Sequence, residues 1–371
     1  MSDSRFSLLV VDDRVPAPEL GAGYPRMFSI LKGLADLGYR VTFFPMIDPQ
    51  RVEPCASVLE KRGIEVICAR GDQKPRFESF YAERKRAYDA VWISRPHNMA
   101  LAGDTIKALN EHQKIVYDAE GLFAMRDARH LETLGYDMPE EVVEGMVREE
   151  IETAARSADL IIAVSEGESR TIKRYTRKPV VTLGYVVDIQ PTSNGFDDRE
   201  DLLFVGAFLL PHSPNEDAVH YFAKDIFPRL HRKLGAKFWI VGTNNVKSVW
   251  NLSGDNIIVA GKVDRVSDYY NRCRTFVVPT RFESGIPLKM FECMSFGLPA
   301  VVTPLIAEQM QLDDDTVLLG GDADQFAENV IRCYRDADLW KKLRRNGFRY
   351  IQKYCSKSTY MDTLQKLKSW I

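Results

Sequence analysis

Short apolar, β-branched runs recur along the whole chain and alternate with longer segments of helical period. The runs are continuously apolar, which is typical of strands covered on both faces. We therefore expect an α/β fold with parallel sheets between helices. In the first half the predicted strands are 8–11, 41–44, 65–68, 90–94, 115–117, 160–164 and 180–183. In the second half they are 202–205, 238–241, 257–260, 276–279, 300–303 and 317–319.

The strand rhythm lapses once, in a segment rich in Pro, Ser, Asn, Gly and Asp, and we predict a linker at 188–200. The 371 residues suffice for two domains. We expect two Rossmann-like, doubly wound domains at 1–187 and 201–354, followed by a C-terminal helix at 355–371. One face of that helix carries Met361, Leu364, Leu367 and Ile371. It could cross back to the first domain or dock on the second, and both alternatives stay open.

Charge and cysteine content exclude several classes of protein. Lys and Arg number 50 against 52 Asp and Glu, with no long run of either sign, so we expect no nucleic-acid partner. The six cysteines lack CxxC spacing and predict neither a zinc site nor a disulfide framework. The apolar run near the N-terminus is too short for a signal peptide or a membrane span. A cytoplasmic protein is expected, with at most peripheral contact at the inner face of a membrane.

The stretch RFESGIPLKMFECMSFGLPAVVT, residues 281–303, follows the predicted strand 276–279. Ile286 precedes a proline, and Pro287 suits the first position of a helix, so we predict a helix that begins near Pro287. The first backbone N–H groups of a helix are free, and Gly285 lets a ligand approach closely. The loop and the helix start, with the N–H groups of Gly285, Ile286, Leu288 and Lys289, therefore predict an anion-binding site.

Lys289 and Glu292 are three residues apart and share one face of this helix, whereas Met290, Cys293 and Met294 form its packing face. A lysine here can neutralise phosphate, and a carboxylate one turn later can accept hydrogen bonds from ribose hydroxyls. A nucleoside diphosphate would fit this arrangement. The alternative is a helix-surface ion pair, which is worth only about 0.3–0.5 kcal/mol.

This stretch resembles the nucleotide-sugar-binding segment of GT-B glycosyltransferases, especially the glycosyltransferase family 4 group. LLFVGAFLLPHSPNEDAVHYFAKDIFP, FWIVG and VAGKVDRVSDYYNRCRTFVVPTRFESG are similar to the same domain of that group. In the first half, RVPAPELGAGYPRMFSILKGLADLGYRVTFFP and ARSADLIIAVSEGE are similar to its first loop and helix and to a late βα unit. The resemblance covers nearly the whole chain, more strongly in the second half.

The resemblance implies a GT-B architecture, with two domains facing across a cleft and the donor held by the second. It implies that Glu292 binds the donor ribose, and that Ser284, Gly285, Ile286 and Lys289 lie beside the diphosphate and the sugar. The family motif would place a further glutamate at Ser284, but the acid here is Glu283, one residue earlier. The role of Glu283 therefore stays open.

Two further residues of the second half are donor-site candidates. Gly206 ends the first strand of the second domain and would permit close approach of a diphosphate, with His212 or Asn215 in reach. Lys262 follows another strand, where family members contact the base or the phosphates. An ordinary surface lysine is the alternative for Lys262. Stabilisation of the leaving diphosphate is assigned to Lys289 and Lys262.

In the first half, Gly21 and Gly23 could bring backbone amides against the phosphate or the sugar, although flexible-loop glycines are an equal alternative. Arg26 stands where the third glycine of a dinucleotide fingerprint would be, so NAD binding loses its support.

SRPHN and YDAEG each follow a predicted strand, which makes His97, Asp118 and Glu120 candidates for acid, base or acceptor-binding roles. His97 could instead be a helix-cap or loop residue. Ser165 and Glu168 are spaced for a capping box, with a ligand contact as the alternative for the glutamate.

Acidic clusters at 12–13 and 313–315 raise the question of metal binding. The helix dipole and lysine already provide positive charge, so we expect no metal and no other cofactor, and a solvated turn at 313–315.

We expect a hexosyltransferase-like glycosyltransferase that moves a sugar from a nucleoside-diphosphate sugar to an acceptor hydroxyl. The resemblance implies retention at the anomeric carbon and no dedicated catalytic base. The acceptor could be a carbohydrate, a lipid-linked sugar or a small molecule, and family analogy favours surface polysaccharide or glycoconjugate synthesis. A nucleotide-sugar 2-epimerase of the same fold and a non-catalytic partner subunit are the alternatives.

Overall fold

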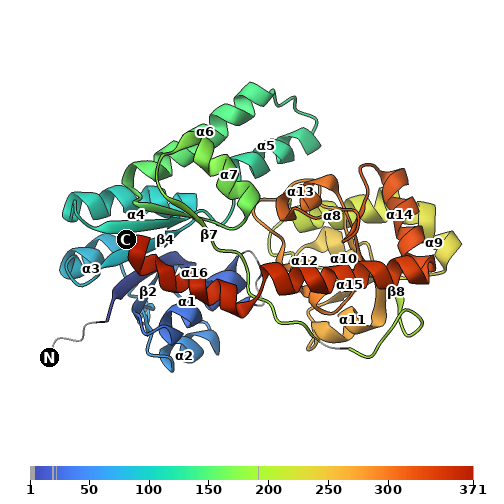
Figure 1. The fold of residues 1–371 in the computed structure, drawn as a ribbon, viewed down its shortest axis with the longest axis horizontal. Helices are drawn as coiled ribbons and strands as arrows, with labels where there is room; N and C mark the ends of the chain where they lie inside the picture. The colour runs from blue at the N-terminus through green and yellow to red at the C-terminus, as the bar shows by residue number, and fades with distance from the viewer. Residues whose placement is uncertain (1–4, 19–20, 22, 191, 371) are drawn as a thin grey trace. The chain divides into compact units, whose positions relative to one another are not determined.

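The computed structural model describes residues 5–18, 21, 23–190 and 192–370. The chain forms two compact units (Figure 1). Unit 1 comprises Met1–Ala128, Asp137–Tyr185 and Ser358–Ile371, and unit 2 comprises Arg129–Tyr136 and Val186–Lys357.

Unit 1 is built on a seven-stranded parallel sheet of order β3-β2-β1-β4-β5-β6-β7. Its strands are β1 (Ser7–Arg14), β2 (Arg40–Asp48), β3 (Glu65–Val66), β4 (Ala90–Ser94), β5 (Lys114–Asp118), β6 (Leu160–Ala163) and β7 (Val180–Thr182). Its helices are α1 (Tyr24–Asp36), α2 (Cys55–Glu60), α3 (Phe77–Arg84), α4 (Pro96–Leu109), α5 (Phe123–Thr133), α6 (Glu140–Ser157), α7 (Glu166–Tyr175) and α16 (Lys357–Trp370), with α5 running on into unit 2.

Both faces of this sheet are covered, which explains its continuously apolar strands. Every residue of β4 is buried. Leu9, Val11, Val91 and Ile93 belong to one core cluster, together with side chains of α3, α4, α6 and α7. On α1, the buried side chains include Met27, Ile30, Leu31 and Leu34.

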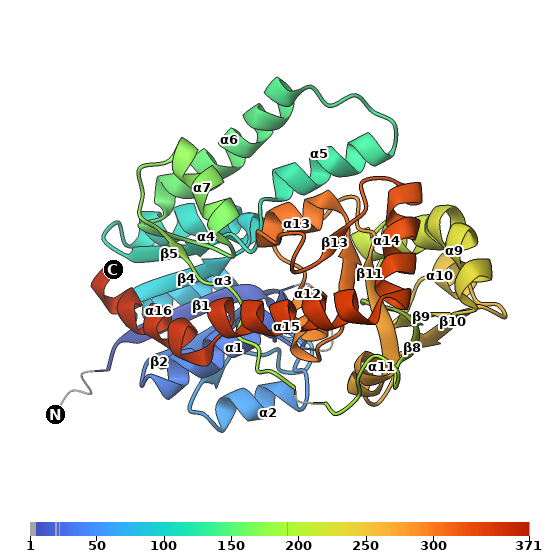
Figure 2. The same cartoon turned by 45° about the vertical axis from the view of Figure 1, so that its right-hand side comes forward.

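Unit 2 holds a six-stranded parallel sheet of order β10-β9-β8-β11-β12-β13. Its strands are β8 (Glu200–Val205), β9 (Phe238–Val241), β10 (Ile257–Gly261), β11 (Cys273–Val278), β12 (Ala300–Val302) and β13 (Leu318–Leu319). Its helices are α8 (Pro214–Tyr221), α9 (Phe227–Leu234), α10 (Lys247–Trp250), α11 (Val266–Arg272), α12 (Leu288–Ser295), α13 (Pro304–Met310), α14 (Ala323–Arg335) and α15 (Ala337–Tyr354), with a π-helical turn at Phe222–Ile226. The helix α14 packs beside α9 (Figure 2).

The predicted α/β class is confirmed, and each predicted strand corresponds to a strand of the structure. The two shortest strands, β3 and β13, have only two residues each. Each lies at the edge of its sheet and pairs with a single neighbouring strand. Apart from the additional strand β7 of unit 1, both sheets have the same strand order, and this order reverses beside the first strand of each sheet. Ligands of such folds bind beyond the carboxyl ends of the strands at that reversal.

The last helix, α16, packs against α1 of unit 1 (Figures 1 and 2). Tyr39 donates a hydrogen bond to the carbonyl of Leu364 at 3.3 Å, and a Cβ on Gly33 would lie 2.6 Å from the Leu364 side chain. Leu364 and Leu367 are buried, and Tyr360 of the same helix is nearly so. Ile371 lies outside the described residues.

Candidate functional site

In unit 2, the strand order reverses between β8 and β11, which are parallel neighbours. Gly206 follows β8, and residues 279–287 join β11 to α12. The residues predicted to bind a donor therefore lie at the sheet edge where doubly wound folds bind ligands.

The helix α12 begins at Leu288, one residue later than predicted. Pro287 has an extended ψ of 113° and occupies the N-cap position instead of the first helical one. Proline offers no side-chain acceptor, and α12 has no side-chain cap hydrogen bond. Gly285 has a φ of 70°, which glycine adopts without strain. The helix start therefore presents uncapped N–H groups and the positive end of its dipole.

Lys289 lies in the first turn of α12 and is 9% exposed. Its Nζ donates a hydrogen bond to Asn215 Oδ1 and lies 4.6 Å from the ring centroid of Phe204. Burial lowers the pKa of the Lys289 amine, and the nearby Glu283 carboxyl opposes this effect. No ion pair joins Lys289 to an acid among the described residues. This buried amine keeps unused capacity to bind an anion.

Gly206 has a packing role beside Lys289. A Cβ on Gly206 would lie 2.9 Å from the Asn215 amide carbon and 2.9 Å from the Phe204 ring. Asn215 also donates to the carbonyl of Ala207 at 2.9 Å. Gly206 thus makes room for the two side chains that contact Lys289.

Glu292 accepts a hydrogen bond from the hydroxyl of Tyr270 at 3.0 Å. Tyr270 is buried and stacks on Phe296, with ring centroids 5.2 Å apart and planes 7° apart. Burial raises the pKa of Glu292, and the bond from Tyr270 opposes the rise. The alternative of a surface pair between Lys289 and Glu292 is wrong, because each has a different partner. Tyr270 was missed, since nothing in its local sequence marks it.

Glu283 lies in the loop before α12, and its Oε2 atom is buried without a hydrogen-bond partner in the described part of the chain. Burial raises its pKa, and the charge of Lys289 lowers it. The neighbouring Ser284 and Gly285 are partly exposed, and Ile286 is 9% exposed. An unpartnered carboxyl beside an amine is a second group with bonding capacity for a ligand.

Two other candidates of unit 2 are exposed. Lys262 directly follows β10, and among the described residues no hydrogen bond or ion pair joins it to Lys289 or Glu292. His212 is exposed, and its backbone N–H bonds to Glu216. The structure therefore brings Lys289, Asn215 and Gly206 together, whereas no hydrogen bond or ion pair within the described residues links Lys262 or His212 to them.

In unit 1, Asp118 ends β5 and Glu120 follows it, and both are ion-paired rather than exposed. Arg26 lies at 2.7 Å from each carboxylate, and all three side chains are almost completely buried. Arg26 also donates to the carbonyl of Leu183, and Trp92 donates to Asp118. The fully buried Asp118 has the geometry of a partner that orients Arg26, and Glu120, 3% exposed, has the same role. Burial raises the pKa of Glu120, although Arg26 opposes the rise.

A second buried cation, Arg95, lies between β4 and α4. It pairs with Asp12 at 2.8 Å and with Asp13 at 3.4 Å. Arg95 has a φ of 76° and Glu120 a φ of 59°, conformations that cost a non-glycine residue about 1–3 kcal/mol each. His97 follows in the first turn of α4, where its Nε2 lies 2.6 Å from Asp13 Oδ1. The sequence signal for this network is the pair of acids near the end of β1 and the arginine directly after β4.

The glycines before α1 have distinct surroundings. Gly23 has a φ of 83° and precedes α1, and a Cβ there would lie 1.9 Å from the Glu120 carboxylate. Gly21 has a φ of 65°, and its carbonyl accepts the N–H of Tyr24. Both positions therefore favour glycine because of their positive φ angles, independently of any ligand contact.

The predicted helix cap at Ser165 is confirmed. Ser165 Oγ accepts the N–H of Glu168 at 3.0 Å, and the Glu168 carboxylate accepts the N–H of Val164 at 2.7 Å. The polar turn at 313–315 is exposed, and Thr316 donates to Asp313. Among the residues with described positions, no cluster of three or more His, Cys, Asp or Glu is placed to hold a metal ion.

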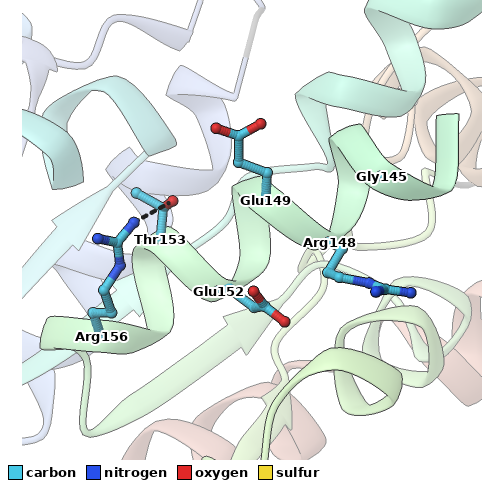
Figure 3. Close-up of a pocket in the computed structure, with 6 residues that line it drawn as sticks. All are labelled: Gly145, Arg148, Glu149, Glu152, Thr153 and Arg156. Carbon is cyan, nitrogen blue, oxygen red and sulfur yellow. Dashed lines mark hydrogen bonds between the residues drawn. The ribbon is translucent and has the colours of Figure 1, made fainter. Parts of the chain in front are cut away.

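A surface pocket on α6 lies away from the strand ends. It is lined by Gly145, Arg148, Glu149, Glu152, Thr153 and Arg156 (Figure 3). All six residues come from one helix, and their long side chains spread along its surface rather than converge. A site for a nucleotide needs groups from several elements. We therefore place the candidate site at the α12 start.

Comparisons with known proteins find a family match in the second half of the chain. Residues 199–336 match the family model described as Glycosyl transferases group 1. The matched segment lies within unit 2. The matched segment includes Gly206, Lys289 and Glu292. A search of curated protein sequences found no match.

Solved structures extend the likeness of fold to the whole chain. Sucrose-phosphate synthase from Thermosynechococcus elongatus is 16% identical, with a TM-score of 0.72 over 98% of each chain. Anabaena HepE in complex with UDP and glucose is 14% identical, with a TM-score of 0.72 over 99% of this chain and 100% of that one. The α,α-trehalose 6-phosphate synthase from Burkholderia multivorans is 12% identical, with a TM-score of 0.65 over 98% and 97%.

These structures confirm the predicted GT-B fold. The family that residues 199–336 resemble and the fold of the whole chain are those that the sequence predicted. Among the described helices, none combines the length and apolar character that a membrane crossing requires.

Proposed function

We propose that this glycosyltransferase moves a sugar from a nucleoside-diphosphate sugar to an acceptor hydroxyl, and that unit 2 holds the donor. In this proposal, Lys289 and the uncapped N–H groups of α12 bind the diphosphate. Glu292, oriented by Tyr270, accepts hydrogen bonds from the ribose hydroxyls. Unit 1 supplies acceptor contacts. The structure of Anabaena HepE in complex with UDP-glucose supports this class of donor, because that protein has the same fold.

The buried Lys289 amine carries this proposal. Burying an amine without an ion-pair partner costs stability, and burial lowers its pKa. Such an amine does not stabilise the fold, whereas its positive charge can bind a diphosphate. The uncapped helix start and the unpartnered Glu283 oxygen lie in the same loop-helix segment.

The transfer breaks the bond between the anomeric carbon and the diphosphate oxygen, and it forms a bond from that carbon to the acceptor oxygen. Negative charge develops on the departing diphosphate, where Lys289 and the α12 dipole stabilise it. We propose that the acceptor proton passes to the diphosphate and that configuration is retained. We also propose that the reaction needs no metal or other cofactor, because the cation and the helix supply positive charge, and that the acceptor is a carbohydrate, with a role in polysaccharide or glycoconjugate synthesis.

Thermal unfolding with UDP, GDP, dTDP and ADP tests donor binding. One diphosphate at 100 times its dissociation constant should add about 2.7 kcal/mol of stability. Glu292→Gln should remove about half of this gain or more, whereas the exposed control Glu308→Gln should keep it. Release of free diphosphate only when an acceptor is present would support transfer. Interconversion of nucleotide sugars without release would support the epimerase instead, and stabilisation by none of the four would contradict the proposal.

A further inference from the structure

Asp13 lies at an irregularity of β1. The pairing of β1 with β2 shifts register between Asp12 and Arg14. Such a bulge redirects a side chain that would otherwise follow the alternation of the strand. The Asp13 carboxylate contacts the first turn of α4. This contact lies at the carboxyl edge of the sheet, beside the point where the strand order reverses.

Three side chains donate to this carboxylate or face it. His97 Nε2 lies 2.6 Å and Asn98 Nδ2 lies 2.9 Å from Asp13 Oδ1, and Arg95 lies 3.4 Å from Oδ2. Burial alone would raise the pKa of Asp13, but the hydrogen bond from His97 and the charge of Arg95 outweigh burial and lower it. Asp13 is therefore ionised near neutral pH and can only accept hydrogen bonds.

An accepting carboxylate fixes the tautomer of the histidine. The His97 nitrogen that faces Asp13 must carry a proton, so Nε2 is the donor and Nδ1 of the neutral ring is the acceptor. The His97 side chain is 43% exposed, and the described residues give its Nδ1 no hydrogen bond. This differs from Asp118, whose carboxylate is buried and paired.

We propose that Asp13 is a positioning residue for His97: it holds the ring with Nε2 protonated, so that Nδ1 accepts a hydrogen bond from a sugar hydroxyl of a substrate. The assignment of the tautomer depends on the contacts given above. The assignment of a sugar hydroxyl as the ligand depends on the proposed function. The hydroxyl belongs to the donor sugar or to the acceptor, and binding measurements separate these sources.

The first test needs no ligand. In long-range ¹H–¹⁵N spectra of the full chain with ¹⁵N-labelled histidine, His97→Gln identifies the His97 signals among the six histidines. We expect a single Nε2-protonated form of neutral His97, and a mixture of both forms in Asp13→Asn. A protonated Nδ1 in the wild type, or the same spectrum in Asp13→Asn, would overturn the positioning role even if the protein proves to be a glycosyltransferase.

The second test uses UDP-, GDP-, dTDP- and ADP-glucose and the matching free diphosphates. Asp13→Asn and His97→Gln should each lower kcat/KM about 10-fold or more, and the double variant should be no worse than either, because both remove one interaction. Asp89→Asn is the control, since Asp89 bonds to the Ser7 N–H at the other edge of the same sheet. Weaker binding of the nucleotide sugar but not of the diphosphate would place the hydroxyl on the donor, and a raised acceptor KM would place it on the acceptor. Additive losses, or losses equal to those of Asp89→Asn, would contradict the proposal.

Discussion

The carboxyl edges of the two sheets carry charged groups in different states. In unit 1, two buried arginines are matched by carboxylates, with Arg26 at 2.7 Å from Asp118 and from Glu120 and Arg95 at 2.8 Å from Asp12. In unit 2, Lys289 donates to the amide oxygen of Asn215, and among the described residues no ion pair joins it to a carboxylate. Charges that satisfy one another hold a fold in place. Charges left with bonding capacity are suited to a ligand.

The largest expected effect is on Arg26. Arg26→Met would leave Asp118 and Glu120 buried without their cation, and breaking a buried pair in this way costs about 3–5 kcal/mol. Urea unfolding measures the loss. A loss below about 1 kcal/mol would show that these charges do not hold unit 1 together and would remove the contrast with unit 2.

Glu168 tests the comparison between paired and unpaired buried charges within unit 1 itself. Its carboxyl group bonds to the backbone N–H of Val164 rather than to a cation. Burial raises its pKa from 4.5 to about 8. Its favourable contribution is complete below pH 4.5 and is lost as pH rises towards about 8, by up to about 1.4 kcal/mol per pH unit.

Glu168→Gln keeps the acceptor for the Val164 N–H and removes the titration. The variant should match the wild type near pH 5 and exceed its unfolding free energy at pH 8. Denaturant unfolding across this range tests the prediction, and parallel pH profiles of the two proteins would refute it.

Lys289→Met should separate function from stability in unit 2. Methionine is one atom shorter than lysine and uncharged, so the change removes a buried charge with little loss of packing, and the unliganded protein should be as stable as the wild type or more stable. Affinity for the stabilising diphosphate should fall about 10- to 100-fold, since a charged hydrogen bond is worth about 1.5–3 kcal/mol. Calorimetric titration measures both variants, with the exposed Lys341→Met as control. A destabilised protein with unchanged affinity would reverse our assignment.

Tyr270→Phe should have the smallest effect. It removes the hydroxyl that orients Glu292 and leaves the stack on Phe296, so we expect about a 5-fold rise in the donor KM from a bond worth about 1 kcal/mol. Tyr350→Phe, which removes a hydroxyl bonded to the Met310 carbonyl, is the control. Equal KM values for both variants would mean that Tyr270 only packs.

The sequence predicted the fold well, because strands buried on both faces are written as continuous apolar runs, as in β4 and β9. It also placed Lys289 and Glu292 on α12, since helix start signals are local. Their partners were not predictable. Tyr270 and Asn215 reach α12 from residues 22 and 74 positions away. The ion pairs of Asp118 and Glu120 with Arg26 likewise depend on tertiary packing.

The central claim is that the start of α12 binds a nucleoside diphosphate through Lys289 and Glu292. Calorimetric titration of the wild type, Glu292→Gln and Glu308→Gln with UDP, GDP, dTDP and ADP tests it most directly. We expect one diphosphate to bind the wild type and the Glu308→Gln control with equal affinity, and to bind Glu292→Gln at least about 10-fold more weakly. Equal binding by all three proteins would contradict this account.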